Sequence, residues 1–443
     1  MCHRLSVAVL GAGPIGLEAA LAAAQGDLDF TVFEAADAVG GHVRQWSHVR
    51  TFTPWSMTVS PRARAVLPEA PDGDELPTGG DLVERLLEPL AATAALAGHL
   101  RMGTRVLGVA REGMLKHEHI GNRGVGGRPF RLLVRRDDGS EAIERADVVI
   151  DATGTYSTPN RLGDGGIDAI NERALDHRID RYLPDFAREA DGWAGRTVLL
   201  SGSGHSAQTA ARALAALATR APGTRVVWAV RNPQPDWGAV AGDPLPERAS
   251  LNASAAELAG GVTGAVEVLP GRVTEALAER DGRVVVTLRD AEGWRAGPRP
   301  TASPSVPAGE PGPQTFSREE VEVDRILALN GGVGDHSLYR QLQVHECYAT
   351  AGPMKLAATL LGETGADCLA TGSAGAEALV NPEPGFFILG AKSYGRNSQF
   401  LLRTGWQQVD DVFGSLLPYM AGVSTAQRPG PLSRRWRGTL DRR

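Results

Sequence analysis

The strongest constraint on the fold is a strand–glycine turn–helix–strand unit that occurs twice in the 443-residue chain. The first copy runs from Ser6 to Ala35 and the second from Thr197 to Arg231. In each copy a short apolar run, typical of a buried parallel strand, leads into a G-x-G-x-x-G/A turn and an alanine-rich helix. Such a unit binds the pyrophosphate of a dinucleotide at the start of its helix. The sequence therefore predicts two dinucleotide sites on one chain.

Each glycine of the first turn has a structural role. Gly11 permits the tight turn out of the strand, Gly13 lets the backbone approach a pyrophosphate, and Gly16 lets helix and strand pack closely. Pro14 suits the first helical turn, where its missing N–H would be unpaired anyway. Glu34 ends the next strand, where a carboxylate accepts hydrogen bonds from ribose hydroxyls.

The second turn differs from the first at the end of its unit. Gly202, Gly204 and Ala207 repeat the fingerprint, and alanine is an accepted third residue. The following strand ends in Arg231 instead of an acid, and a guanidinium pairs with a 2′-phosphate that a carboxylate would repel. We therefore expect FAD at the first site and NADPH at the second, with hydride passing from nicotinamide to flavin. A solvated Arg231 at a strand end is the alternative.

Chain length and order of segments predict an α/β fold with two Rossmann-like dinucleotide-binding domains. The FAD domain is expected to be discontinuous, over residues 1–158 and 324–443, with the NADPH domain inserted over residues 159–323. A proline-rich stretch at 297–313 cannot form a hydrogen-bonded ladder, so a disordered loop is expected there. The 111–129 segment is expected to be the loop of a hairpin.

Composition narrows the class of protein. The net charge of −6 is small for this length, so neither nucleic acid nor a membrane surface is an expected partner, although the last residues, 433–443, are basic. Three cysteines without a C-x-x-C pair fit a reducing cytoplasm, and no metal site is expected. The sequence contains no run of 18 apolar residues, so a membrane span is not expected.

Several segments together resemble the two-dinucleotide-domain flavoproteins, and within them the flavin-containing and N-hydroxylating monooxygenases. The resemblance rests on the two glycine turns, Gly40-Gly41 with Arg50 and Pro54 downstream, and "DATG" at Asp151 to Gly154. It implies that the arginine-to-proline segment lies by the flavin and that the ATG strand joins the two domains. It also implies an NADPH-reduced flavin to which oxygen adds at C4a, giving a peroxyflavin.

The chain also departs from that family. Its F-x-G-x-x-x-H fingerprint is missing before the second turn, Phe52 stands where an acid is common, and "GAKSYGR" replaces a Gly-Asp pair used by many disulfide reductases. Baeyer–Villiger chemistry and disulfide reduction are therefore disfavoured, which leaves an atypical branch of the resemblance.

Three functions stay open from the sequence. The first is an FAD- and NADPH-dependent monooxygenase that uses O2 to oxygenate a small nucleophilic nitrogen or sulfur compound or a similar heteroatom substrate. The second is an NADPH-dependent flavin oxidoreductase or oxidase that passes electrons to a quinone, a partner protein or O2. The third is a redox sensor that reads NADPH without turnover. A homo-oligomer is also left open.

The expected site residues fall into two groups. Catalytic candidates near the flavin are Arg50, Lys392 and Arg396. Lys392 and Arg396 either stabilise the charge of reduced flavin or bind pyrophosphate or a neighbouring carboxylate. His42 is either an acid–base group or a hydrogen-bonded loop histidine, and His205 is expected to line the NADPH phosphates. The residues expected to bind cofactors are Gly11, Gly13, Pro14, Ile15, Gly16, Glu34, Gly41, His42, Thr153, Gly154, Gly202, Gly204, His205, Ser206, Ala207 and Arg231.

Overall fold

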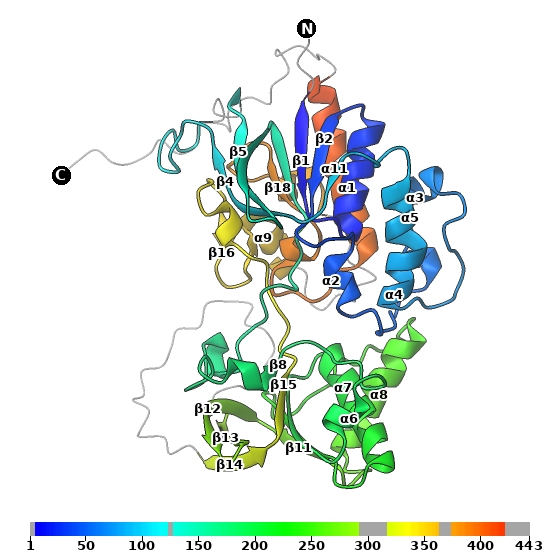
Figure 1. Cartoon of the computed structure of the whole chain (residues 1–443), viewed down its shortest axis with the longest axis vertical. Helices are drawn as coiled ribbons and strands as arrows, with labels where there is room; N and C mark the ends of the chain where they lie inside the picture. The colour runs from blue at the N-terminus through cyan, green and yellow to red at the C-terminus, as the bar shows by residue number, and fades with distance from the viewer. Residues whose placement is uncertain (1–4, 123–126, 292–316, 363–373, 421–443) are drawn as a thin grey trace, which may run out of the picture.

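The computed structural model describes residues 5–122, 127–291, 317–362 and 374–420. The chain forms two lobes along its long axis, and each lobe contains one of the two glycine turns (Figure 1). The proline-rich stretch at 297–313, the basic end at 433–443, Cys2 and Cys368 lie outside the described residues.

The first lobe is built on a five-stranded parallel sheet in the order β18-β7-β1-β2-β3. The strand of the ATG segment and a strand from the far end of the chain join the sheet that starts at Ser6. Its strands are β1 (Ser6–Leu10), β2 (Asp29–Phe33), β3 (Leu100–Arg101), β7 (Val148–Asp151) and β18 (Phe386–Ile388).

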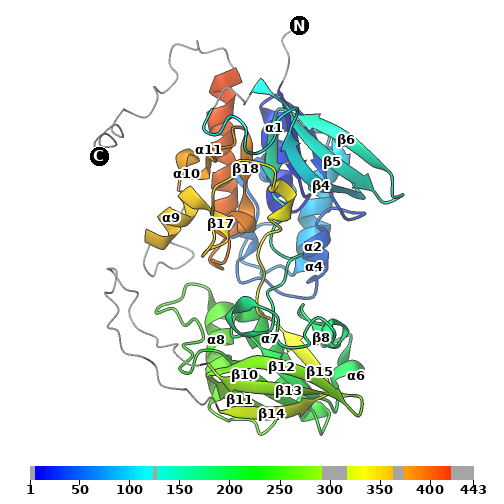
Figure 2. The same ribbon diagram turned by 90° about the vertical axis from the view of Figure 1, so that its left-hand side faces the viewer.

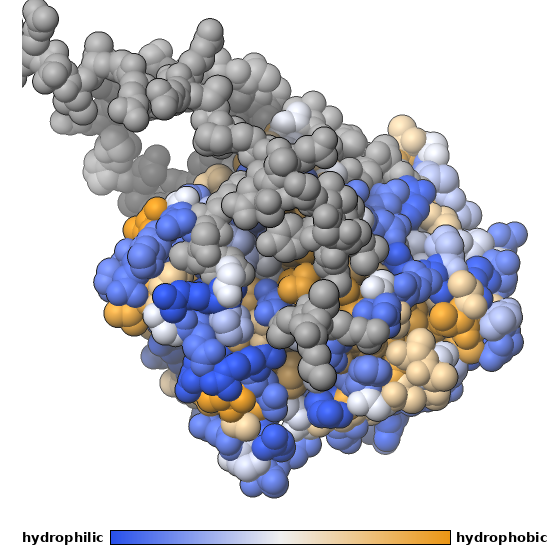
Figure 3. Space-filling view, turned by 90° about the horizontal axis from the view of Figure 1, so that it is seen from above, coloured by the Kyte–Doolittle hydropathy of each residue, from blue (hydrophilic) through white to orange (hydrophobic). Residues whose placement is uncertain are grey.

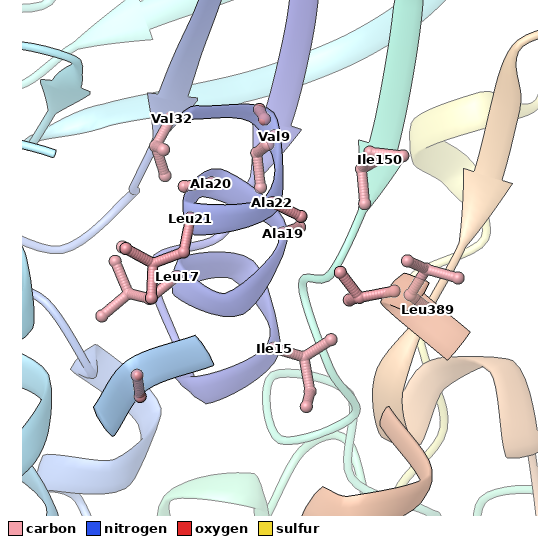
Figure 4. Close-up of a cluster of buried hydrophobic side chains, with 14 of the residues drawn as sticks. Val9, Ile15, Leu17, Ala19, Ala20, Leu21, Ala22, Val32, Ile150 and Leu389 are labelled. Atoms are coloured by element: carbon pink, nitrogen blue, oxygen red, sulfur yellow. The ribbon is translucent and has the colours of Figure 1, made fainter. Parts of the chain in front are cut away.

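Both faces of this sheet are covered, which explains its continuous apolar strands. Successive side chains of β1 alternate: Val7 and Val9 pack into a helical layer, whereas Ala8 and Leu10 pack against a second sheet. The helical layer contains α1 (Pro14–Gln25) and α11 (Leu402–Met420), which contact each other. Figure 4 shows Val9 pointing toward α1, and Ile15 at the start of α1 near Leu389. The second sheet is antiparallel, with strands β4 (Thr104–Arg111), β5 (Phe130–Arg136) and β6 (Glu141–Ala146).

The second lobe repeats this arrangement. Its parallel sheet has the order β11-β10-β9-β15-β8, formed by β8 (Ile179–Asp180), β9 (Thr197–Ser201), β10 (Arg225–Val230), β11 (Val266–Pro270) and β15 (Arg325–Ala328). Val198 and Leu200 face the helical layer, and Leu199 between them faces an antiparallel sheet. The helices are α6 (Ala190–Trp193), α7 (His205–Arg220) and α8 (Pro246–Ala259), and the antiparallel strands are β12 (Arg272–Arg280), β13 (Arg283–Asp290) and β14 (Arg318–Val323).

The return of the chain to the first lobe comes later than the expected boundary at 323. β15 pairs with β9 on one side and β8 on the other, so Arg325–Ala328 belongs to the second sheet. The boundary was placed one strand too early, at the end of β14, because the hydrophobic pattern of β15 does not tell which of the two parallel sheets it joins.

Two antiparallel segments connect the lobes, visible in the rotated view of Figure 2. Asn160 N–H donates to the Gly331 carbonyl at 2.9 Å, and Val333 N–H donates to the Thr158 carbonyl at 3.1 Å. The outgoing chain after β7 and the returning chain after β15 are therefore hydrogen-bonded to each other between the domains.

The remaining elements surround the first sheet. They are α2 (Gly41–Arg44), α3 (Pro61–Val66), α4 (Gly79–Leu82), α5 (Glu88–Ala92), β16 (Glu346–Cys347), β17 (Gly352–Pro353), α9 (Met354–Gly362) and α10 (Ala376–Leu379). β4 and β5 form the expected hairpin around the 111–129 segment. Within the described ranges, no helix combines the length and apolar character that a membrane span requires. On the face seen in Figure 3, hydrophilic residues are interspersed with separate hydrophobic ones where grey atoms do not cover them.

Candidate dinucleotide sites

The two glycine turns have the same backbone geometry. Gly11 has φ +96° and Gly202 has φ +114°, a region that L side chains rarely adopt. A Cβ on Gly11 would lie 2.9 Å from the Ala152 carbonyl oxygen, and one on Gly202 would lie 2.4 Å from that of Leu329. Each first glycine is therefore required both by its own conformation and by the neighbouring strand end.

The second glycine of each turn faces open space. Gly13 and Gly204 immediately precede α1 and α7, and neither helix start has a side-chain cap. A Cβ on either glycine would meet no atom within 4 Å. The N-terminal N–H groups of both helices are thus left accessible, together with the positive end of each helix dipole, which suits an anionic pyrophosphate.

The third position explains why one turn has glycine and the other alanine. A Cβ on Gly16 would lie 1.9 Å from the Gly11 carbonyl oxygen, so no side chain fits there. Ala207 is fully buried in the second domain, where its methyl group packs in the helical layer. Both positions therefore serve the packing of helix against strand.

A cavity of about 610 Å³ extends from the first turn along the end of the first sheet. Its size lies within the range of ligand sites in proteins. Of the residues expected to bind the first cofactor, all but Gly16 line it: Gly11, Gly13, Pro14, Ile15, Glu34, Gly41, His42, Thr153 and Gly154.

Glu34 lines the cavity beside the glycine turn. Its Oε2 accepts a hydrogen bond from Ala12 N–H at 2.6 Å and its Oε1 accepts one from Ala36 N–H at 2.9 Å. These bonds fix the carboxylate against the glycine turn and leave a second lone pair on each oxygen. Arg105 lines the same cavity, and its positive charge acts on His42.

Aromatic side chains from both lobes border the cavity where the domains meet. Tyr156 stacks on Tyr182 with ring centroids 4.7 Å apart, and Tyr182 Oη donates to the Tyr156 carbonyl at 3.0 Å. The His42 ring lies 5.7 Å from that of Tyr156. Burial, followed by the charge of Arg105, lowers the pKa of His42, with Glu34 opposing them. Burial also raises the pKa of Tyr156 to about 12.

Lys392 is completely buried behind the cavity wall. Its Nζ donates to Asp151 Oδ2 at 2.6 Å, to the Asp335 carbonyl at 2.8 Å and to Thr153 Oγ1 at 3.1 Å. The Thr153 hydroxyl in turn donates to Asp151 Oδ1 at 2.7 Å. Of the alternatives open for Lys392, the structure shows the pairing with a neighbouring carboxylate.

The other expected cations are exposed. Arg50 lies on the segment that pairs with Thr78 and does not line the cavity. Arg396 follows the loop after Gly390, and its backbone N–H donates to the Thr350 carbonyl at 2.7 Å. Arg231 follows the end of β10 in the second lobe. Their expected roles in catalysis and phosphate binding stay predictions.

The backbone of the second turn is held by side chains of its own domain. Trp228 Nε1 donates to the Gly202 carbonyl at 2.7 Å, and Gln208 Nε2 donates to the Ser203 carbonyl at 2.9 Å. His205 and Ser206, at the start of α7, are exposed. Partial desolvation, followed by the charge of Arg248, lowers the pKa of His205, with Asp243 opposing them.

Several cavity residues were not singled out from the sequence. Arg105 and Val106 lie on β4, a strand expected only as part of a hairpin, and Phe400 lies just before α11. Tyr156 offered the clearest signal, since it lies two residues after the ATG segment. Tyr182 comes from the other lobe, so only the placement of the two domains brings it to the cavity.

Comparison with known proteins agrees with this geometry. Residues 9–69 match the family model of the NAD(P)-binding Rossmann-like domain. No match was found among curated protein sequences.

Among solved structures, bacillithiol disulfide reductase Bdr (YpdA) from Bacillus cereus aligns with TM-score 0.65 and 16% identity, over 94% of this chain and 100% of that one. The FAD-bound cadaverine monooxygenase DfoA from Erwinia amylovora aligns with TM-score 0.60 and 11% identity, over 100% of both chains. Ornithine N-hydroxylase KtzI from Kutzneria sp. 744, with reduced FAD, NADP+ and L-ornithine, aligns with TM-score 0.58 and 14% identity, over 94% of this chain and 100% of that one. The chain thus has the fold of two-dinucleotide-domain flavoproteins.

Proposed function

We propose that the protein is an FAD- and NADPH-dependent monooxygenase that oxygenates a small nucleophilic nitrogen or sulfur compound. The observation that carries the proposal is that the chain forms the same pyrophosphate-binding turn and helix start twice; we call each of them a cradle. Gly11 and Gly202 adopt the same tight turn with positive φ, and Gly13 and Gly204 leave the same open space before a helix. Two such cradles in one chain favour a pair of dinucleotides that exchange electrons.

The cavity at the first glycine turn suits FAD. The start of α1 offers free N–H groups to the pyrophosphate, and Glu34 keeps acceptor capacity for ribose hydroxyls. Lys392 and Asp151 hold the cavity wall through Thr153, and His42 and Tyr156 also line the cavity. Bound flavin supplies the two-electron and oxygen chemistry, while these residues bind it, orient it and exclude water.

The second cradle suits NADPH. The start of α7 offers N–H groups to the pyrophosphate, and the exposed Arg231 at the end of β10 is available to a 2′-phosphate. The absence of an acid at that strand end removes the repulsion that would otherwise favour NADH.

Oxygenation is favoured over disulfide reduction by the cysteine content. The chain has three cysteines and no C-x-x-C pair, and Cys347 does not line the cavity. The sequence therefore offers no C-x-x-C pair for dithiol exchange with a disulfide substrate. Two of the three solved structures compared above act on amines, which supports a nucleophilic nitrogen substrate.

The test is a turnover experiment with ¹⁸O2. Flavin-loaded protein, NADPH and a panel of primary amines, thioethers and hydroxylamines are incubated together, and NADPH loss, hydrogen peroxide and product mass are measured. A monooxygenase consumes one NADPH, one proton and one O2 for each oxygenated product and one water. An ¹⁸O-labelled product with little peroxide supports the proposal. Peroxide equal to the NADPH consumed, unchanged by every substrate of the panel, would instead favour the oxidase alternative.

A further inference from the structure

One aromatic contact joins the two lobes at the second glycine turn. The ring of Phe52, from the first lobe, meets the ring of His205 edge-on, with centroids 5.0 Å apart and planes at 71°. His205 is the first residue of α7 and directly follows Gly204. The contact therefore lies beside the helix start that the proposed function assigns to NADPH.

The position of Phe52 is fixed by the first lobe. Thr51 N–H donates to the Pro77 carbonyl at 2.8 Å, and Gly79 N–H donates to the Val49 carbonyl at 2.9 Å. The segment from Val49 to Phe52 is thus held by a backbone ladder on its own domain. Val49 also packs against the core of the second lobe, so the segment touches that lobe at two points.

The contact borders the cradle without filling it. The Cβ position of Gly204 has no atom within 4 Å, so Phe52 leaves the space in front of this glycine open. Packing against Phe52 restrains the His205 ring, which otherwise lies exposed at the first turn of α7.

We propose that Phe52 is a positioning residue of the NADPH site, supplied by the flavin domain: it holds His205 beside the start of α7 and forms the rim of the site that faces the flavin cavity. This inference rests on the proposed assignment of the second cradle to NADPH. If residues of both domains form the NADPH site, the relative position of the domains contributes to nucleotide binding.

The test compares Phe52→Ala and Phe52→Tyr with the wild type, all loaded with FAD. NADP+ affinity is measured by calorimetry, and the rate of flavin reduction at saturating NADPH is measured anaerobically. Phe52→Ala should raise the Kd for NADP+ by about 2- to 10-fold, the factor that an aromatic pair of this geometry contributes, and should slow reduction. Phe52→Tyr, which keeps the ring, should have a Kd for NADP+ and a rate of flavin reduction close to those of the wild type. FAD content should stay unchanged, and the melting temperature of Phe52→Ala should fall by no more than a few degrees, the loss that one aromatic pair accounts for. Tyr348→Ala, which removes a ring that is 97% exposed, is the control.

A negative charge introduced at position 52 provides a second test of the proposal. A carboxylate in Phe52→Asp should weaken NADP+ binding more than the amide in Phe52→Asn, and added salt should narrow the difference, because the charge would lie near the bound phosphates. If Phe52→Ala binds NADP+ as tightly as the wild type, or more tightly, the inference is overturned while the NADPH assignment stands. If the wild type binds no NADP+ and NADPH does not reduce its flavin, both are overturned.

Discussion

Lys392 places its ammonium nitrogen 2.6 Å from Oδ2 of Asp151, and neither side chain is reached by solvent. Asp151 is the last residue of β7, from which the chain leaves for the second domain, and the same ammonium group binds the carbonyl of Asp335 on the returning segment. A single buried cation therefore ties together both interdomain segments at the wall of the cavity. The pair explains why a lysine in this loop is compatible with a fully enclosed position.

Removing the cation should destabilise the protein strongly. Lys392→Met leaves Asp151 buried without its partner, so the free energy of unfolding should fall by about 3–5 kcal/mol in urea denaturation. The double variant Lys392→Met/Asp151→Asn should recover part of this loss. Lys355→Met is the matched control, because Lys355 and its partner Glu377 are 49% and 94% exposed, and it should change stability by less than about 0.5 kcal/mol. Equal effects of the two lysine variants would contradict the role given to the buried pair.

Substitutions at two glycines of the first turn should separate cofactor binding from folding. Gly13 has an extended backbone with φ −80° and ψ −174° and open space at its Cβ, so Gly13→Val should fold normally but lose flavin. Gly16→Val should instead lose stability by about 1–3 kcal/mol or more, since its Cβ would collide with the Gly11 carbonyl. Visible absorption and thermal melts distinguish the two. A yellow Gly13→Val protein would show that the pyrophosphate does not lie at this glycine.

Arg231 should determine the choice between the two nicotinamide nucleotides. Arg231→Asp should raise the KM for NADPH about 10- to 100-fold, because a charge-assisted bond is replaced by repulsion, and should change the KM for NADH much less. Arg225→Asp, at the other end of β10, is the control and should leave both values near the wild type. Steady-state kinetics with both nucleotides measure this, and an equal effect of Arg231→Asp on both would remove the preference for NADPH.

His42 should make the flavin-free protein less stable in acid. Its pKa in the fold lies below the ordinary value of 6.5, mainly because of burial, so the unfolded chain takes up a proton more readily than the folded one. The free energy of unfolding should therefore fall as the pH falls below 6.5. Denaturation curves between about pH 7 and pH 5 should show a smaller decrease for His42→Gln than for the wild type. Identical pH dependence in the two proteins would mean that His42 is not desolvated.

Local patterns in the sequence were sufficient to predict both cradles. The G-x-G-x-x-G/A spacing predicted a tight turn at Gly11 and its repeat at Gly202, and the apolar runs before them were confirmed as buried parallel strands. These features depend on residues close together in the chain, which is why one sequence reveals them.

Long-range relationships could not be predicted in the same way. Asp151 and Lys392 are 241 residues apart in the chain, and the sequence left the partner of Lys392 open. The contact of Phe52 with His205 depends on how the two domains are placed, which no local pattern encodes. The domain boundary failed for a related reason, because the hydrophobic pattern of β15 does not tell which of two parallel sheets it joins.

We propose that the first cradle holds flavin and that the second delivers hydride to it from NADPH. The most direct test mixes NADPH anaerobically with flavin-loaded wild-type protein and with Gly204→Val, in which the valine side chain would occupy the open space before α7. We expect the visible flavin absorption of the wild type to bleach with saturable dependence on NADPH, and Gly204→Val to keep its flavin but bleach far more slowly. A protein that takes up no flavin, or a Gly204→Val variant reduced as fast as the wild type, would contradict the account.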